Sequence, residues 1–504
     1  MKKQLLFELT QSLLRKMSFR ITAFTVLTLL TVQSSFAQKW TVLGSGSGSI
    51  SSGATLYTSI AVVNNGAVYT PYVAFTEATI GKVKKRLSDG TWSDVSTGLP
   101  GTAVTYTRLF SNSLGELFIT YIDGSSTPVN RLAIKKLDFN DSTWKSINND
   151  DANTLYVSTN SANPNTNSNF TSANRCSIVF DSSNTPYIAY VESNNPYLKK
   201  FDGTTWVNVG TQPISADVAI SPDLALDSNG YPWVSYTKLA TTGATTGSIS
   251  LFGYNGSVWT DYSPSTPITS TRFTCISFKD TNTLYLGYAN TSSSTRATIV
   301  ACNKSLPAGT GWGLATAIGT NSASYISMIK DNSGNLYCAF RDAFTATPTK
   351  ISPRVMFLGT SQSVWTELKD PSVTYGIEEQ TLWPSIAIGN ASYPYVAYST
   401  NTTPTLATAR VFDPLIKSSA VTAITSTTAT AGGEVLSGAT SVGTVTERGI
   451  VYGLTFNPTT ADTKIVDGAT TTGMYTSPIT GLTDAVTYHV RAYLFLVTEL
   501  FLKS

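Results

Sequence analysis

Short apolar stretches alternate with polar turns along most of this chain, and the alternation recurs about every 50 residues. One unit begins with the apolar stretch 59–62, passes through the Asn-Asn-Gly turn at 64–66, and reaches aromatic and β-branched residues at 71–75. A third stretch, 82–87, ends in the turn Ser-Asp-Gly-Thr-Trp at 88–92. Asp and Asn in such turns bond to their own main chain, and Asp-Gly and Asn-Gly favour tight hairpins. The pattern predicts four short antiparallel strands in each unit.

The tryptophans mark the same period. Seven of the nine fall at a nearly constant interval, and the last three gaps are 53 residues each: Trp40, Trp92, Trp144, Trp206, Trp259, Trp312 and Trp365. A fixed period of this length indicates a repeat architecture. Four antiparallel strands per unit form one blade of a β-propeller, in which blades stack around an axis because a single small sheet cannot bury its faces. We expect each of these tryptophans to lie between two blades.

The number of blades follows from the second strand of each unit, which ends in an aromatic residue. Seven such ends occur: Phe75, Tyr121, Tyr190, Tyr236, Tyr288, Phe340 and Tyr398. The last unit lacks a Trp-containing strand, whereas Trp40-Thr41-Val42-Leu43-Gly44 reads like the fourth strand of another unit. We therefore predict an all-β fold, with a seven-bladed β-propeller at residues 38–414 whose N-terminal strand closes the last blade and removes an open edge. Six blades and a separate hairpin are the alternative.

The N-terminal segment is typical of export. Residues 21–32 form an apolar run after Arg15, Lys16 and Arg20, and Ser35-Phe36-Ala37 provides a cleavage site. We interpret 1–37 as a signal peptide, with Met17 as an alternative start, because the run is too short to span a membrane. The predicted location is extracellular or on the cell surface, and we expect no membrane span in the mature chain. A net charge of +3 is too small to indicate a nucleic-acid partner.

The repeat stops near Ile416, and residues 415–504 read as a second module. The segments 428–435 and 448–453 alternate as strands, and Gly481-Leu482-Thr483 precedes Thr487-Tyr488-His489-Val490-Arg491-Ala492-Tyr493. This ending resembles a fibronectin type III module, a β-sandwich in which Tyr488 is the expected corner tyrosine. The apolar residues 494–502 depart from that pattern, so we expect an incomplete sandwich with an atypical or truncated last strand.

Several chemistries are excluded by composition. The single histidine, His489, lies outside the predicted propeller, which excludes Ser-His-Asp triads and sites with several histidine ligands there. Two of the four cysteines, Cys176 and Cys275, occupy similar apolar strands, where we expect buried thiols; export also permits disulfides. The Asp-x-Asn-Gly turns lack the full ligand spacing of calcium loops. We expect no cofactor, with calcium as the weaker alternative.

Two further resemblances concern sugar-binding and sugar-cleaving propellers. The turns 88–92 and 202–206 resemble the Asp-box of sialidases, which in that family is a structural turn. The repeat is also similar to exported bacterial propellers related to fucose-binding lectins, which implies sugars bound by aromatic stacking with Arg and Glu. The sialidase resemblance implies an arginine cluster, but Arg108, Arg272, Arg341 and Arg354 are joined by no motif.

These observations yield five candidate ligand-binding residues: Trp383, Tyr375, Glu379, Arg341 and Asp342. Trp383 is the tryptophan that the repeat does not require, and Tyr375 and Glu379 precede it in what we interpret as a loop. Glu378-Glu379 is a poor catalytic dyad, because adjacent side chains on an extended segment point in opposite directions. We expect no catalytic residues and a non-catalytic binding or adhesion protein whose partner is an extracellular glycan or surface protein. A polysaccharide-active hydrolase or lyase with a carboxylate-based centre is one alternative, and a structural spacer is the other.

Overall fold

The computed structural model describes residues 38–497, except for 44–48, 67, 149–154, 163–175, 245, 293–295, 321, 345–349, 361, 370–380, 390–392, 401–403, 437–443 and 455–457. The predicted signal peptide therefore lies outside the described residues. Within them the regular secondary structure consists of β-strands. They include no helix that is long and apolar enough to cross a lipid bilayer. The described chain forms two compact units, of which one is Trp40–Phe412 and the other contains the segment from Asp413 onward.

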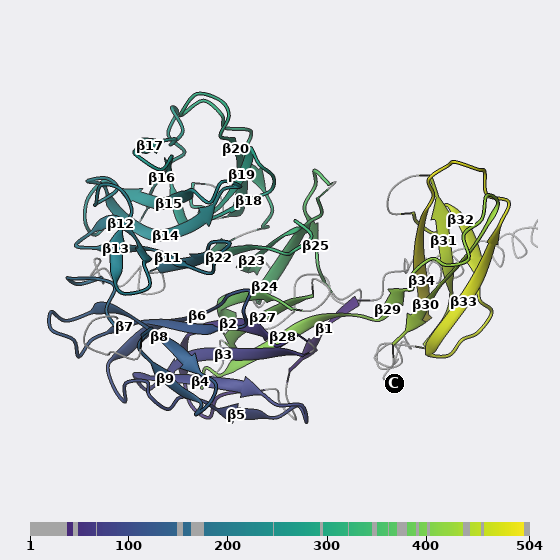
Figure 1. Ribbon diagram of the computed structural model, residues 1–504, viewed down its shortest axis with the longest axis horizontal. Helices are drawn as coiled ribbons and strands as arrows, with labels where there is room; N and C mark the ends of the chain where they lie inside the picture. Colours follow the sequence, from purple (N-terminus) through teal and green to yellow (C-terminus); the bar gives the residue numbers. More distant parts are fainter. Residues whose placement is uncertain are drawn as a thin grey trace, which may run out of the picture. The chain divides into compact units, whose positions relative to one another are not determined.

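The first unit is a β-propeller of seven antiparallel blades with four strands each (Figure 1); five blades are separate sheets, and a single pairing of β16 with β18 joins the fourth and fifth blades into one eight-stranded sheet. The prediction of seven blades is confirmed. Blades one to three are β2 (Thr55–Asn64), β3 (Tyr69–Glu77), β4 (Ile80–Arg86) and β5 (Trp92–Asp94); β6 (Val104–Ser111), β7 (Leu117–Asp123), β8 (Arg131–Asp138) and β9 (Thr143–Lys145); and β10 (Cys176–Phe180), β11 (Pro186–Glu192), β12 (Asn195–Phe201) and β13 (Trp206–Asn208). Blades four and five are β14 (Val218–Leu226), β15 (Pro232–Leu239), β16 (Gly247–Tyr254) and β17 (Trp259–Asp261); and β18 (Thr271–Phe278), β19 (Thr283–Asn290), β20 (Arg296–Asn303) and β21 (Thr316–Ala317). Blades six and seven are β22 (Ser322–Lys330), β23 (Leu336–Phe344), β24 (Lys350–Leu358) and β25 (Thr366–Glu367); and β26 (Thr381–Ile388), β27 (Pro394–Thr400), β28 (Ala407–Pro414) and β1 (Gln38–Val42).

The last blade is closed by the N-terminal strand, as the sequence predicts. Its strand order is β1-β28-β27-β26, so the two ends of the propeller chain pair in one sheet. The Leu43 amide donates to the Ala409 carbonyl at 2.9 Å and continues this pairing beyond β1. The closure leaves no unpaired gap between the first and last blades, which protects the sheet edge from pairing with another chain.

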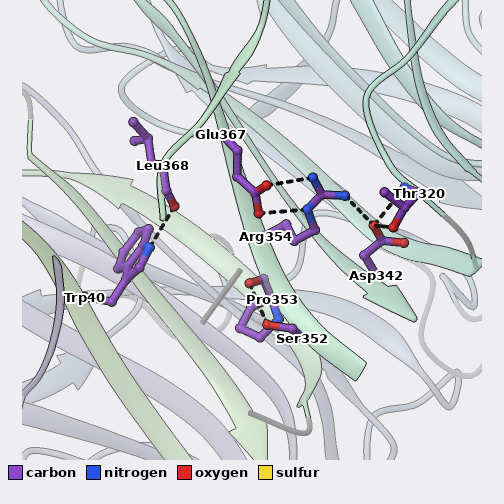
Figure 2. Close-up of polar contacts among 8 residues, drawn as sticks. All are labelled: Trp40, Thr320, Asp342, Ser352, Pro353, Arg354, Glu367 and Leu368. Atoms are coloured by element: carbon purple, nitrogen blue, oxygen red, sulfur yellow. Dashed lines mark hydrogen bonds and ion pairs between the residues drawn. The ribbon is translucent and has the colours of Figure 1, made fainter. Parts of the chain in front are cut away.

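The tryptophans of the outer strands join neighbouring blades through one repeated hydrogen bond. Trp144 Nε1 donates to the Val95 carbonyl at 2.7 Å, and Val95 follows the preceding tryptophan, Trp92, by three residues. Trp92, Trp259 and Trp312 make the equivalent bond to Leu43, Val209 and Tyr262. Trp40 completes the series across the closure, since its Nε1 donates to the Leu368 carbonyl at 2.9 Å (Figure 2). The predicted position of these side chains between blades is confirmed, and the indole N–H adds a specific bond to the apolar contact.

The aromatic residues of the second strands form the buried layer of each blade. The seven that the sequence predicts are at most 1% exposed: Phe75, Tyr121, Tyr190, Tyr236, Tyr288, Phe340 and Tyr398. The hairpin turns use side-chain acceptors in the way expected for Asp and Asn. Asp202 Oδ1, for example, accepts from the Thr204 and Thr205 amides at 2.8 Å, and these bonds lower the pKa of Asp202. All four cysteines are buried free thiols, as expected for Cys176 and Cys275.

The longest gap between tryptophans, from Trp144 to Trp206, corresponds to an extra segment on the second blade. Tyr156 forms an antiparallel bridge with Ala133 of β8. The Ile134 amide donates to the Leu155 carbonyl at 2.8 Å, and the Val157 amide donates to the Leu132 carbonyl at 3.0 Å. The described residues 155–157 of this segment therefore pair with an existing blade.

The second unit is a β-sandwich of two three-stranded sheets within the described residues. One sheet has the order β29 (Ile416–Ser418), β30 (Thr428–Val435), β33 (Gly473–Thr480), and the other has the order β32 (Thr463–Val466), β31 (Thr444–Gly453), β34 (His489–Val497). Their inner faces share a core that includes Ile450, Ile479 and Leu494. The Thr483 amide donates to the Tyr488 hydroxyl at 3.3 Å, which is the contact expected of a corner tyrosine.

Candidate functional site at the propeller centre

The innermost strands of the propeller share an irregularity near the end where they begin. In six of them that the structure describes, the pairing with the second strand shifts register, so that two residues face one. At each shift one residue adopts a left-handed backbone with φ between 48° and 56°: Tyr57, Tyr106, Ser221, Phe273, Tyr325 and Trp383. Left-handed backbone costs a residue other than glycine about 1–3 kcal/mol, and such strain gathers at functional sites. The corresponding part of the third blade lies outside the described residues.

Five of these six residues are aromatic, and their rings form a continuous arc from blade to blade. Adjacent ring centroids are 4.3 Å apart for Tyr106 and Tyr57, and 5.6 Å apart for Tyr57 and Trp383. The series continues with 6.1 Å between Trp383 and Tyr325 and 5.3 Å between Tyr325 and Phe273. Four of the rings are half-buried, and Phe273 is 8% exposed. The arc thus follows the innermost strands of five consecutive blades, and on the fourth blade the small Ser221 takes the aromatic position.

Two residues after the left-handed residue on β2, β26 and β14, a side-chain oxygen ties the innermost strand to a neighbouring blade. Ser59 Oγ accepts from the Leu109 amide at 3.0 Å, and Ser385 Oγ accepts from the Ile60 amide at 3.3 Å. Asp223 occupies the same position on β14, where Oδ2 accepts from the Ile276 amide at 2.8 Å. A serine hydroxyl is therefore sufficient to accept this hydrogen bond, and the fold does not require a carboxyl group at the position of Asp223.

Arg108 and Asp223 are the charged members of this inner ring among the described residues. They lie on β6 and β14, on either side of β10 of the third blade. The Arg108 guanidinium donates to the Cys176 carbonyl, and Asp223 bonds to the Ser177 hydroxyl. Desolvation by the surrounding protein raises the pKa of Asp223, against the opposing effects of the Ser177 hydroxyl, the Ile276 amide and the Arg108 charge. The centre of the propeller therefore holds a carboxyl group that keeps its proton to a higher pH than an ordinary aspartate.

Carboxylates also follow the ends of several second strands, where they hold the loops that lead into the innermost strands. Asp123 accepts from the Tyr156 hydroxyl at 2.7 Å, and burial together with this carboxylate raises the pKa of Tyr156 to about 12. Glu192 accepts from the Asn160 amide, and Glu77 accepts from a backbone amide of the loop before β2. Asp123 and Glu192 are each 4% exposed. Their contacts indicate structural roles at this end of the propeller.

Asp342, one of the predicted ligand-binding residues, belongs to a buried ion network (Figure 2). Its Oδ2 accepts from Arg354 Nη1 at 2.6 Å and from the Thr320 amide at 2.9 Å, and its side chain is 0% exposed. Arg354 also donates to both carboxylate oxygens of Glu367 at 2.9 and 2.8 Å. Asp342 and its neighbour Arg341 lie within β23 rather than after it. Asp342 therefore ties β23 to β24 and has no surface with which to contact a ligand.

Arg341 and Trp383 are brought together. Trp383 lies within the innermost strand β26, so the interpretation of its surroundings as a loop was wrong at this residue. Arg341 Nε donates to the carbonyl of Thr381, two residues before Trp383, at 3.1 Å. Tyr375 and Glu379 lie outside the described residues.

The other four aromatic residues of the arc were not predicted as site residues, although the sequence carries a signal for them. On each of these strands, the aromatic residue comes two residues before the position that faces the neighbouring blade, as in Tyr57-Thr58-Ser59 and Trp383-Pro384-Ser385. An alignment of the units on these small residues, rather than on the outer tryptophans, places the aromatics in one column.

No protein-family model matches this chain, and no curated protein sequence matches it. Among solved structures it is similar to a protein of unknown function from Dyadobacter fermentans, with 8% identity, a TM-score of 0.44, and coverage of 76% of this chain and 100% of the other. It is similar to an α-L-arabinofuranosidase from Fusarium graminearum, with 12% identity, a TM-score of 0.39, and coverage of 64% and 97%. It is also similar to an α-L-arabinanase from Penicillium chrysogenum, with 10% identity, a TM-score of 0.37, and coverage of 76% and 99%.

The activities named for these structures are those of glycoside hydrolases. On this finding, the prediction of a non-catalytic binding or adhesion protein is wrong. The fold itself is that of an all-β propeller.

Proposed function

We propose that this chain is a polysaccharide-active hydrolase with its acid, Asp223, at the centre of the propeller. The observation that carries the proposal is the carboxyl group of Asp223 in a ring where the first and seventh blades use serine for the equivalent contact. Desolvation of the carboxyl group in this position raises its pKa, so that it keeps its proton to a higher pH, as a catalytic acid must.

The chemistry follows from this protonation state. The carboxylic acid of Asp223 donates its proton to the oxygen of the glycosidic bond as the bond from that oxygen to the anomeric carbon breaks. Water supplies the hydroxyl group that the anomeric carbon gains, and a general base accepts the remaining proton of that water. The rings of the aromatic arc lie two residues before Asp223 and its equivalents on the innermost strands, where sugar rings would stack on them.

The test is product release from a panel of plant and bacterial polysaccharides by the chain 38–504. We expect new reducing ends, and we expect Asp223→Asn to lower the rate by a factor of at least about 100, the lower range for a catalytic acid. Asp280→Asn is the matched control, because Asp280 is an exposed carboxylate in the turn between β18 and β19. Products with an unsaturated end would identify a lyase and contradict hydrolysis. A folded chain that releases nothing from the panel would contradict catalysis.

We further infer that the protein is exported, and that its propeller is of the exported bacterial type with Asp-box-like turns and fucose-lectin-like repeats. The supporting features are the apolar run before Ala37 and the Asx geometry of the turns at Asp89 and Asp202. For the second unit we propose a fibronectin type III-like module, supported by the corner contact of Tyr488. N-terminal sequencing of protein recovered outside the producing cell tests export. A first residue of Gln38 is expected, and retention inside the cell with an intact N-terminus would contradict it.

A further inference from the structure

Arg341 contacts two of the strands that carry the aromatic arc, and it has no carboxylate partner among the described residues. Its Nε donates to the Thr381 carbonyl at 3.1 Å, and its Nη1 donates to Ser324 Oγ at 3.2 Å. Both acceptors are neutral. Among the described residues Arg341 forms no ion pair, and Asp342, its neighbour in sequence, bonds to Arg354 instead. Successive side chains of a strand point to opposite faces, which explains this separation.

A half-buried guanidinium without a counter-ion is costly for a folded protein. Burial lowers the pKa of Arg341, and the nearby Tyr325 opposes this effect. Removing a charge from water is repaid only when an opposite charge or several hydrogen bonds replace the water. Arg341 can donate five hydrogen bonds, and two have acceptors among the described residues. Within that part of the chain its other donors have no acceptor, and they can bind one from outside the chain.

Near Arg341, the indole N–H of Trp383 also lacks a hydrogen-bond acceptor. Trp383 Nε1 is buried and has no hydrogen-bond partner within the described part of the chain. Its ring lies 6.1 Å from the ring of Tyr325, and Ser324, which Arg341 contacts, precedes Tyr325 on β22. A cation, an unused indole N–H and two neighbouring aromatic rings therefore meet between the sixth and seventh blades.

We propose that this place is a subsite for an acidic sugar, in which Arg341 binds the sugar carboxylate and the rings of Trp383 and Tyr325 carry its apolar face. An arginine fork matches the two oxygens of a carboxylate, and stacked rings suit the flat C–H face of a sugar. The substrate class of the proposed hydrolase is then a polysaccharide that contains uronic acids. This inference rests on the proposed function for the position of the substrate at the propeller centre.

The experiment measures binding separately from turnover. Asp223→Asn in the chain 38–504 prevents hydrolysis, and isothermal titration then compares oligosaccharides of galacturonate, glucuronate and mannuronate with their neutral hexose counterparts. At least one uronate should bind roughly ten- to hundredfold more tightly than its neutral counterpart, as expected for hydrogen bonds to a charged group. Arg341→Gln should abolish this preference, whereas Arg341→Lys should keep part of it. Trp383→Phe should weaken binding of both sugar types, and Arg296→Gln, at an exposed arginine of β20, should change neither.

The outcomes separate this inference from the function on which it rests. Equal affinity for acidic and neutral sugars across the panel, or an unchanged preference in Arg341→Gln, would overturn the acidic-sugar subsite even if the wild type hydrolyses a neutral glycan. Selective uronate binding that depends on Arg341, together with no product release by the wild type, would support the subsite and contradict the hydrolase. Circular dichroism of each variant ensures that a loss of binding is compared between folded proteins.

Discussion

Replacement of Trp144 tests whether the tryptophans of the outer strands hold the blades together. The Trp144 side chain is 2% exposed between the first and second blades, and its Nε1 donates to the Val95 carbonyl at 2.7 Å. Trp144→Ala removes most of an aromatic side chain that buries roughly 150–250 Å². Substitutions of this kind in a packed core cost about 3–5 kcal/mol. Trp144→Phe keeps an aromatic ring but removes the indole N–H, so about 1–3 kcal/mol is expected from the unpaired Val95 carbonyl.

The assay is urea unfolding of the chain 38–504 followed by circular dichroism, with hydrogen exchange of β5 and β9 as a local measurement. Leu314→Ala is the control, because Leu314 is 94% exposed and a surface change of this kind stays within about 0.5 kcal/mol. The expected order of stability is wild type, then Trp144→Phe, then Trp144→Ala, with faster exchange in both strands. A loss below about 1 kcal/mol in Trp144→Ala would refute the reasoning, since no well-packed interface between the blades would then depend on this residue.

Three further predictions address other parts of the propeller. Arg354→Leu should cost about 3–5 kcal/mol in urea unfolding, because it leaves the buried Asp342 carboxylate without its partner; a loss near zero would contradict the buried network. A thiol reagent should label none of the four cysteines in the folded chain and all of them in denaturant. All four thiols are buried, and burial raises the pKa of Cys302 to about 12. Rapid labelling of the folded chain would contradict the packing. Because the pKa of Asp223 is raised in the folded state, its contribution to stability is present below the unfolded pKa of aspartate and is lost as the pH rises through the folded pKa. Asp223→Asn should therefore be at least as stable as the wild type at neutral pH, with a smaller advantage in acid; a less stable variant at neutral pH would contradict this sign.

The fold was predictable from the sequence because its constraints repeat. Five of the seven outer tryptophans make the same hydrogen bond to the blade before them, so burial and hydrogen bonding keep the interval nearly constant. Asp202 and Gly203 form a turn by local backbone chemistry alone, which a sequence shows directly. The closing strand was predictable for the same reason, since Trp40 makes the bond that Trp92, Trp144, Trp259 and Trp312 make in their units.

The candidate site was less predictable because it depends on departures from the repeat. A left-handed residue in a strand, such as Trp383, gives no propensity signal, so its place on the innermost strand was not foreseen. Asp223 could not be recognised as unusual until the structure aligned it with Ser59 and Ser385 at the inner ring. Asp342 is adjacent to Arg341 in sequence, but successive side chains of a strand point to opposite faces. The Asp342 side chain therefore points toward Arg354.

The central claim, that Asp223 protonates a glycosidic oxygen, is tested most directly by comparing two substrates of the same sugar. One is the natural glycoside, and the other is a dinitrophenyl glycoside whose leaving group needs no proton. The account predicts that Asp223→Asn loses hydrolysis of the natural glycoside by a factor of at least about 100 and keeps most of its activity on the dinitrophenyl glycoside. Equal losses on both substrates, or no loss on the natural glycoside, would contradict it.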